Sequence, residues 1–291
     1  MRIREPVVAG QFYAADPERC RADVQALIDR VRAATVVEER LVGGIVPHAG
    51  WSFSGAVAAK VLFALSTSRK PTVIVLFGGV HRYRGREAAL FGDGRWETPI
   101  GPVAIDDRLA ERILGQTNLI IDDPYAHESE HSLEVQMPLV ARLFPDAKVV
   151  PIMIPPVNTA AEIGEAVART LTSYDYDAIV IGTTDLTHYG PRYGLVSHGL
   201  GPSGNAWAKE ANDTRFIELA CTLQADKVVA EAREHRNACS SGAVAATLAA
   251  AAALGATHGR LLEHTTSSEV LAAQIAGDVD DSVGYAGIVF S

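Results

Sequence analysis

One segment of the chain reads Thr72-Val73-Ile74-Val75-Leu76-Phe77-Gly78-Gly79-Val80-His81. Its β-branched part predicts a short β-strand over Thr72–Phe77, and the two glycines that follow bring the chain to His81. A helical pattern, Gly55–Leu65, precedes this strand. A strand therefore alternates with a helix here, which is typical of an α/β protein.

The same alternation extends along the chain in both directions. The predicted strands are, in order, Gly43–Pro47, Thr72–Phe77, Ala147–Ile154, Ala178–Gly182 and Val283–Phe290. Further helices are predicted from Asp16-Pro17 to Val31 and at Asp107–Leu114, Ser132–Leu143, Ala160–Leu171, Ala225–Glu234 and Ser240–Leu254. We interpret Ala88–Ile105 as a hairpin excursion. The whole pattern predicts a single α/β domain over residues 1–291, with a mostly parallel central sheet flanked by helices.

Composition and charge exclude several classes of protein. The 291 residues carry 26 Lys and Arg against 35 Asp and Glu, so the net charge of −9 argues against nucleic-acid binding. Three widely spaced cysteines argue against a disulfide framework. The first residues do not resemble a signal peptide, and the longest apolar run, Ala243–Leu254, is shorter than the ~20 residues of a membrane span. We expect a cytoplasmic globular protein that does not associate with membranes.

Polar side chains follow three of the predicted strands. His48 comes after the first strand, His81 after the second, and Asp185 with His188 after the fourth. Because ligands of open α/β sheets bind beyond the carboxyl ends of the strands, these side chains should meet in one cleft. Two histidines with one anionic residue suffice for a mononuclear metal site. The alternative is that each is an ordinary loop residue.

Cys239 directly precedes the predicted helix Ser240–Leu254. The free N–H groups and the dipole of a helix N-terminus favour the thiolate, which is the form that binds metals. Cys239 is therefore the candidate anionic ligand, although a small buried residue at a helix start is an equally good interpretation. Cys20 and Cys221 lie in helical patterns beside apolar neighbours, and we expect them to be structural.

The segment His127-Glu128-Ser129-Glu130-His131 matches the HExxH pattern, which on a helix places two histidines one turn apart as zinc ligands. It follows an acidic, turn-like stretch, and the next helix is predicted to start only at Ser132. His127 would then lie before that helix and would not pair with His131. A zincin-type protease is therefore not favoured.

The stretch Gly190–Trp207 contains five glycines and two prolines. A structureless loop of this length inside a compact domain is usually functional or disordered. Since it begins two residues after His188, we expect a mobile lid over the cleft, on which Tyr193 and Trp207 pack against a ligand. The alternative is an ordinary surface insertion.

Six stretches of this sequence occur together in one known family. They are Arg4–Tyr13, Val46–Trp51, Trp96–Gly101, Glu130–Pro138, Thr184–Tyr189 and Ser282–Phe290. Through them the chain resembles, nearly end to end, the Memo family, including the members labelled protein B of the AmmeMemoRadiSam system. That family is similar in fold to the class III extradiol dioxygenases, which hold non-haem Fe(II) with two histidines and a glutamate.

The resemblance implies the metal ligands His48, His81 and Cys239, with Asp185 and His188 as catalytic residues in the same cleft. It also implies that the segment around His131 flanks the cleft without supplying a ligand. One divalent metal is implied, with Fe(II) preferred. Because a thiolate replaces the glutamate of the dioxygenases, copper and zinc become competitors, and ring cleavage is placed in doubt.

The leading hypothesis for the function is a metal-dependent oxidoreductase that acts with O₂ on a small molecule. Asp185 would orient an imidazole, and His188 would exchange a proton with the substrate. One alternative is a binding module whose cleft receives a peptide or a partner protein without turnover. Another is Zn-dependent hydrolysis with His188 as general base. The sequence leaves a homo-oligomer open.

Overall fold

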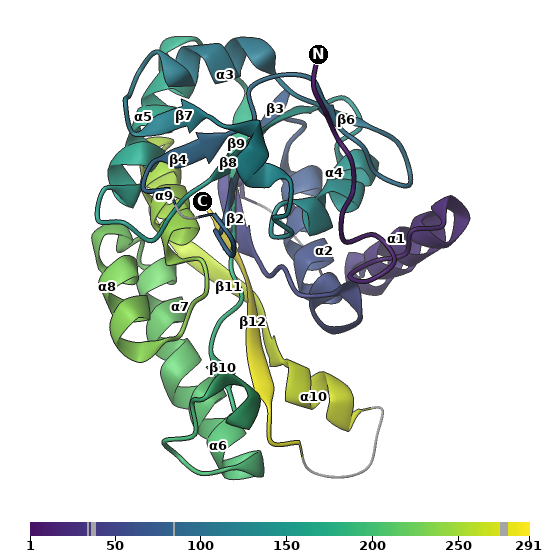
Figure 1. Ribbon diagram of the computed structural model, residues 1–291, viewed down its shortest axis with the longest axis vertical. Helices are drawn as coiled ribbons and strands as arrows, with labels where there is room; N and C mark the ends of the chain where they lie inside the picture. Colours follow the sequence, from purple (N-terminus) through teal and green to yellow (C-terminus); the bar gives the residue numbers. More distant parts are fainter. Residues whose placement is uncertain (34, 36–38, 84, 274–278) are drawn as a thin grey trace.

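The computed structural model describes residues 1–33, 35, 39–83, 85–273 and 279–291. Its centre is a large β-sheet (Figure 1). The strands of this sheet are β2 (Gly43–Val46), β3 (Val73–Gly78), β4 (Ala88–Leu90), β7 (Ile120–Asp122), β8 (Lys148–Met153), β9 (Ala178–Thr183), β10 (His188–Tyr189), β11 (Gly259–Thr266) and β12 (Ser282–Phe290). A second, small sheet contains β1 (Ile3–Arg4), β5 (Arg95–Trp96) and β6 (Val103–Ala104).

The strand order of the large sheet is β10-β12-β2-β9-β3-β8-β4-β7, and β11 pairs with β12 outside this path. The four central strands, β2, β9, β3 and β8, are parallel to one another. β12 is antiparallel to β2, and β4 is antiparallel to β8. The predicted α/β fold is thus confirmed, with a parallel centre joined on each side by an antiparallel pairing, which makes the sheet mixed.

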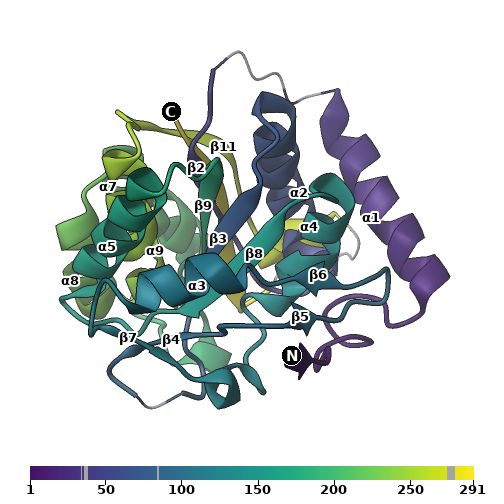
Figure 2. The ribbon, with the colours of Figure 1, turned by 90° about the horizontal axis from the view of Figure 1, so that it is seen from above.

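Helices cover both faces of the sheet. They are α1 (Pro17–Arg32), α2 (Trp51–Ser68), α3 (Asp107–Leu114), α4 (Met137–Leu143), α5 (Ala160–Ser173), α6 (Gly201–Trp207), α7 (Thr214–Cys221), α8 (Ala225–His235), α9 (Ser241–Ala253) and α10 (Ser267–Ala272). Figure 2 shows α1, α2 and α4 on one side of the sheet and α5, α7, α8 and α9 on the other. The sheet therefore lies between two layers of helices.

The apolar run of β3 shows how one strand serves both layers. Val73, Val75 and Phe77 pack in the core beside α5 and α9, whereas Ile74 and Leu76 pack in the core beside α1 and α2. All five side chains are fully buried. Because successive side chains of a strand point to opposite faces, a run without polar residues is what a strand covered on both faces requires.

The five predicted strands all form, with ends that differ by no more than two residues. Two other predictions need correction. The helix expected from Ser132 begins as a 3₁₀ turn at Glu134–Gln136 and becomes α-helical only at Met137. In the predicted hairpin Ala88–Ile105, β4 joins the large sheet, and only β5 and β6 pair as a hairpin.

The stretch Gly190–Trp207 is not a structureless loop, so that prediction is wrong. It contains a 3₁₀ turn at Pro191–Tyr193 and the helix α6, and the ring of Trp207 stacks on His198 with a centroid distance of 3.7 Å. Trp207 thus packs within its own segment, whereas the sequence suggested that it packs against a ligand. The motion of a lid stays a prediction.

Within the described residues, none of the helices combines the length and the apolar character that crossing a membrane requires.

Candidate metal centre

The polar side chains predicted at strand ends lie at one edge of the sheet. Val46 at the end of β2 is opposite Thr183 of β9, and the ends of β9 and β3 are also neighbours. His48, Asp185 and His81 follow these three strand ends. The structure therefore brings them together, as parallel strands that end side by side should.

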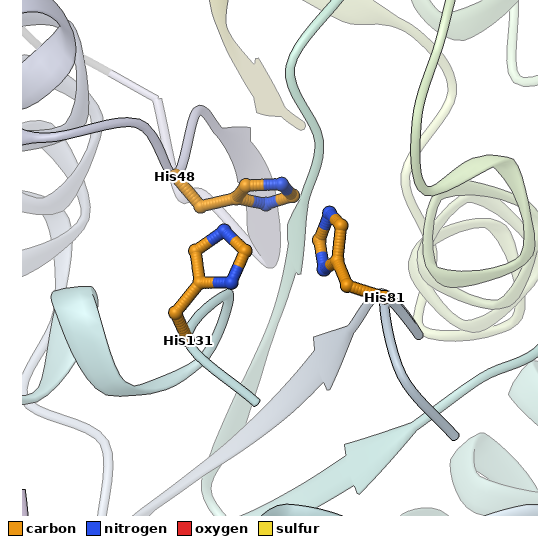
Figure 3. A group of neighbouring side chains, drawn as sticks. All are labelled: His48, His81 and His131. Carbon is orange, nitrogen blue, oxygen red and sulfur yellow. The ribbon is translucent and has the colours of Figure 1, made fainter. Parts of the chain in front are cut away.

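Three imidazoles form a cluster at this edge. His48, His81 and His131 each offer a ring nitrogen, and these nitrogens all lie within 4.8 Å of one another. Their ring centroids are 5.2 Å apart for His48 and His81, 5.4 Å for His48 and His131, and 4.4 Å for His81 and His131. Figure 3 shows the three rings, which come from separate segments, facing a common space. Such a group could hold one metal ion.

His48 is held by contacts at both its backbone and its ring. Its backbone N–H donates to Asp185 Oδ1 at 2.8 Å, and its Nδ1 lies 3.1 Å from Thr183 Oγ1. These contacts leave Nε2 facing the centre, 3.2 Å from Cys239 Sγ. Burial would lower the pKa of His48, but the nearby Cys239 and Asp185 raise it.

The buried carboxylate of Glu130 positions the other two histidines. Its oxygens accept the backbone N–H of His81 at 2.8 Å and that of His131 at 3.0 Å, and Oε1 also lies 2.8 Å from His81 Nδ1. A fourth bond comes from the N–H of Ser132 at 2.9 Å. Burial would raise the pKa of Glu130, but the contacts with His81 hold it well below its usual range. Glu130 thus fixes the ring nitrogen that His81 turns toward the centre.

The two rings differ in protonation. Burial would lower the pKa of His81, but its contacts with Cys239 and Glu130 raise it to about 10. Burial and the charges of His48 and His81 lower the pKa of His131 to about 3. His131 is therefore neutral at physiological pH, which is the state that metal coordination requires, whereas His81 carries a proton that a bound metal must displace.

Replacement of Glu130 tests this arrangement. We expect Glu130→Gln to weaken metal binding by about 10–100-fold, because the amide cannot accept all the N–H groups that orient His81 and His131. Competition with a chromogenic chelator measures the affinity. Glu128→Gln is the matched control, since Glu128 is exposed two residues away. Equal affinities of the two variants would contradict this role.

Cys239 borders the imidazole cluster and lies two residues before α9, whose first residue is Ser241. Its backbone N–H donates to the carbonyl of Asp185 at 3.1 Å, and its sulfur accepts the N–H of Asp185 at 3.3 Å. Burial would raise the pKa of the thiol, but the neighbouring imidazoles, His48 above all, hold it well below its usual range. The site therefore favours a thiolate at this position.

Alkylation tests the thiolate. In metal-free protein at mildly acidic pH, we expect iodoacetamide to label Cys239 ahead of Cys20 and Cys221. Burial raises the pKa of Cys20 to about 11 and also raises that of Cys221. Bound metal should protect Cys239, and mass spectrometry of the peptides measures the labelling. Equal labelling of the three thiols, with or without metal, would refute the idea.

Asp185 contacts the backbones of two other residues of the site. Its carboxylate accepts a backbone N–H from His48, whereas the imidazole of His48 is bonded by Thr183. The role of Asp185 in orienting an imidazole stays a prediction. Asp185 joins the backbones of His48 and Cys239, and burial raises its pKa.

His188 lies at the start of β10, opposite Val283 of β12. Its ring packs against Tyr193 with a centroid distance of 5.0 Å, and it contributes to the lowered pKa of Cys239. Its Nε2 is buried and has no hydrogen-bond partner among the described residues. The ring of His188 is therefore enclosed between Tyr193 and Cys239.

The HExxH pattern does not lie on one helix. His127 ends a 3₁₀ turn at Pro124–His127 and is fully buried, and its Nε2 donates to the carbonyl of Ala89 at 3.0 Å. The pair of zinc ligands expected of a zincin therefore does not form. The ring of His131, which the family resemblance placed beside the cleft without a role as ligand, lies in the imidazole cluster.

The donor set fits a transition metal. Three imidazole nitrogens with a thiolate beside them suit iron, copper or zinc, whereas magnesium and calcium prefer oxygen ligands. His81 Nδ1 is bonded to the carboxylate of Glu130, a partner that commonly orients metal-binding imidazoles, and His48 Nδ1 is bonded to the hydroxyl of Thr183. The residues present therefore fit a metal ion.

Three residues of this site were missed by sequence reasoning. They are His131, Glu130 and Thr183. A signal existed for the first two, because both stand in the stretch Glu130–Pro138 that supports the family resemblance. Thr183 is the last residue of a buried strand, and its sequence neighbourhood gives no signal of a polar contact.

The chain is similar to the members of one protein family. A family model described as "Memo-like protein" matches residues 4–289. A MEMO1 family protein of Methanopyrus kandleri is 34% identical over 99% of this chain and 98% of its own length. Another, from Methanothermobacter thermautotrophicus, is 34% identical over 98% of this chain and 99% of its own length.

A solved structure supports the fold alone. The crystal structure of an uncharacterized protein from Escherichia coli K12 matches with a TM-score of 0.52 at 12% identity, and the match covers 87% of this chain and 100% of that chain.

Proposed function

Because this chain belongs to the Memo-like protein family, we propose that it binds one redox-capable metal ion, which is iron. With this metal it acts as an oxidoreductase that uses O₂ on a small molecule in the cytoplasm. The observation that carries the proposal is the group of His48, His81 and His131 with the thiol of Cys239 beside it. A thiolate next to imidazoles is a donor set for a redox-active metal.

In this proposal the three imidazoles and Cys239 hold the ion, and iron supplies electron transfer to O₂. The chain's own residues provide the rest. His48 is buried, whereas the side chains of His81 and His131 are 32% and 21% exposed. A substrate therefore reaches the centre from the side of His81 and His131.

His188 is the residue that moves a proton in this proposal. Its Nε2 has no hydrogen-bond partner among the described residues, its ring packs against Tyr193, and it lowers the pKa of the neighbouring Cys239. A general acid or base needs a nitrogen that is not already bonded within the protein. Asp185 and Thr183 keep His48 in place beside it.

Replacement of His188 by alanine separates proton transfer from metal binding. We expect His188→Ala to retain its metal and to lose turnover by about 10²–10⁴-fold, the usual contribution of a general acid or base. Metal analysis and O₂ uptake are the two measurements. His258→Ala, an exposed histidine outside the site, is the control. If His188→Ala loses its metal, then His188 is a ligand and the role given to it here is wrong.

The test of the proposed function is O₂ uptake by iron-loaded protein under air, with and without a reductant. Metal-dependent uptake that Cys239→Ser abolishes is the result expected. No uptake with iron or copper, together with metal-independent binding of a peptide, would favour a binding module. Hydrolysis by the zinc form without O₂ uptake would favour a hydrolase. Either result would overturn the oxidoreductase proposal.

A further inference from the structure

The segment that carries His188 is held from three directions through Thr187, the residue before it. The N–H of Thr187 donates to Asp213 Oδ1 at 2.9 Å, and its hydroxyl accepts from Asn212 Nδ2 at 3.1 Å. Its carbonyl accepts the N–H of Gly284 at 3.0 Å. The backbone at His188 is therefore held by Asn212 and Asp213 on one side and by Gly284 and the pairing with Val283 on the other.

Asn212 and Asp213 end a π-helical segment, Ala208–Asp213, that joins α6 to α7 in one continuous run of helix. A π turn closes on i→i+5 bonds and is rare, and it occurs often at functional sites. In this protein the π turn ends at Asn212 and Asp213, and the side chains of both residues bond to Thr187.

The carboxylate of Asp213 is fully buried, and both of its oxygens are bonded. Oδ2 lies 3.0 Å from Nε2 of His264 on β11, while Oδ1 accepts from Thr187. The strand beside it is shaped to admit this carboxylate, because a Cβ at Gly284 would lie 2.0 Å from Oδ2. A buried carboxylate is costly unless its oxygens are satisfied, and none of these partners belongs to the imidazole cluster.

The same π segment also holds the segment that leads to Cys239. Asn237 stands two residues before Cys239, is fully buried and donates from Nδ2 to the carbonyl of Asn212 at 3.0 Å. Asn212 therefore touches both the segment of His188, through its side chain, and the segment of Cys239, through its carbonyl, whereas Asp213 touches the segment of His188. These contacts add to the direct bonds between Asp185 and Cys239, which also join the two segments.

We propose that Asp213 is a positioning residue that fixes the imidazole of His188 relative to Cys239, with Asn212 as the second attachment. The importance of this for turnover rests on the proposed function, but the positioning itself does not. It is measured in metal-free protein without substrate, so its failure is distinguishable from failure of the proposed oxidoreductase activity.

The experiment records the imidazole nitrogen signals of ¹⁵N-histidine-labelled protein, with the His188 signals identified by their loss in His188→Ala. Asp213→Ala removes the acceptor of the Thr187 N–H, and we expect the His188 signals to move. Asp213→Asn keeps an oxygen that can accept the N–H of Thr187, and its amide group can donate to the other tautomer of His264. The His188 signals of this variant should therefore stay as in the wild type. His127, bonded to Ala89 far along the chain, reports that the fold is intact.

Two results would overturn the proposal. One is unchanged His188 signals in folded Asp213→Ala, and the other is an equal displacement in Asp213→Asn and Asp213→Ala. If the His127 signals show that Asp213→Ala does not fold, Asn212→Leu decides, because it removes the donor to the Thr187 hydroxyl. Displaced His188 signals in folded Asn212→Leu support the proposal, and unchanged signals overturn it.

Discussion

Replacement of Glu134 by alanine is expected to lower the free energy of unfolding by roughly 3–5 kcal/mol, because it leaves a buried arginine without its counter-charge. Glu134 is 1% exposed and pairs with Arg4, which is 4% exposed. Its carboxylate also accepts the backbone N–H groups of Val7 and Val8 and the hydroxyl of Tyr13, each at 2.9 Å. This one carboxylate thus contacts the N-terminal segment at Arg4, Val7, Val8 and Tyr13.

Thermal unfolding measures this effect. At about 2–4 °C per kcal/mol for a domain of this size class, the midpoint should fall by roughly 6–20 °C. Glu165→Ala is the matched control, because Glu165 forms an exposed i,i+4 pair with Arg169 at 3.4 Å, and such pairs contribute about 1 kcal/mol or less. Equal midpoints for Glu134→Ala and Glu165→Ala would show that the buried pair does not hold the N-terminal segment.

The parts of the fold that the sequence predicted are those with a strong local signal. β3 and β9 are runs of β-branched and apolar residues, and the helix over Asp107–Leu114 has an aspartate cap. The type and the ends of these three elements could therefore be predicted. The prediction of a loop at Gly190–Trp207 was wrong because glycine and proline are typical of loops, whereas part of this stretch forms a helix. Gly201, Pro202 and Gly204 lie in α6, and packing of Tyr189 and His198 on Trp207 stabilises that segment.

The sequence predicted those residues of the candidate site that directly follow the ends of strands. It did not predict the residues that join the site only through tertiary contacts. His48, His81 and Asp185 follow three adjacent strands, so their proximity follows from the topology. His131 was misjudged because the HExxH letters suggested a helix with His127, and rejection of the helix removed both histidines together. The contact of Glu130 with His81 spans 49 residues and has no local pattern.

The central claim is that His48, His81 and His131 hold one metal ion together with the thiolate of Cys239. Because the ligand atoms share one coordination sphere, loss of any imidazole should remove most of the bound metal. The two histidines of the HExxH segment form a matched pair for the test, since only His131 belongs to the cluster and His127 is bonded to Ala89.

The most direct measurement is the metal-to-protein ratio of anaerobically purified protein, determined by elemental mass spectrometry for the wild type, His131→Ala and His127→Ala. We predict a ratio near one metal ion per chain for the wild type, most of it iron, a ratio near zero for His131→Ala, and retention of the metal in folded His127→Ala. A metal-free wild type that takes up no iron, copper or zinc, or a His131→Ala variant as fully loaded as the wild type, would contradict the account.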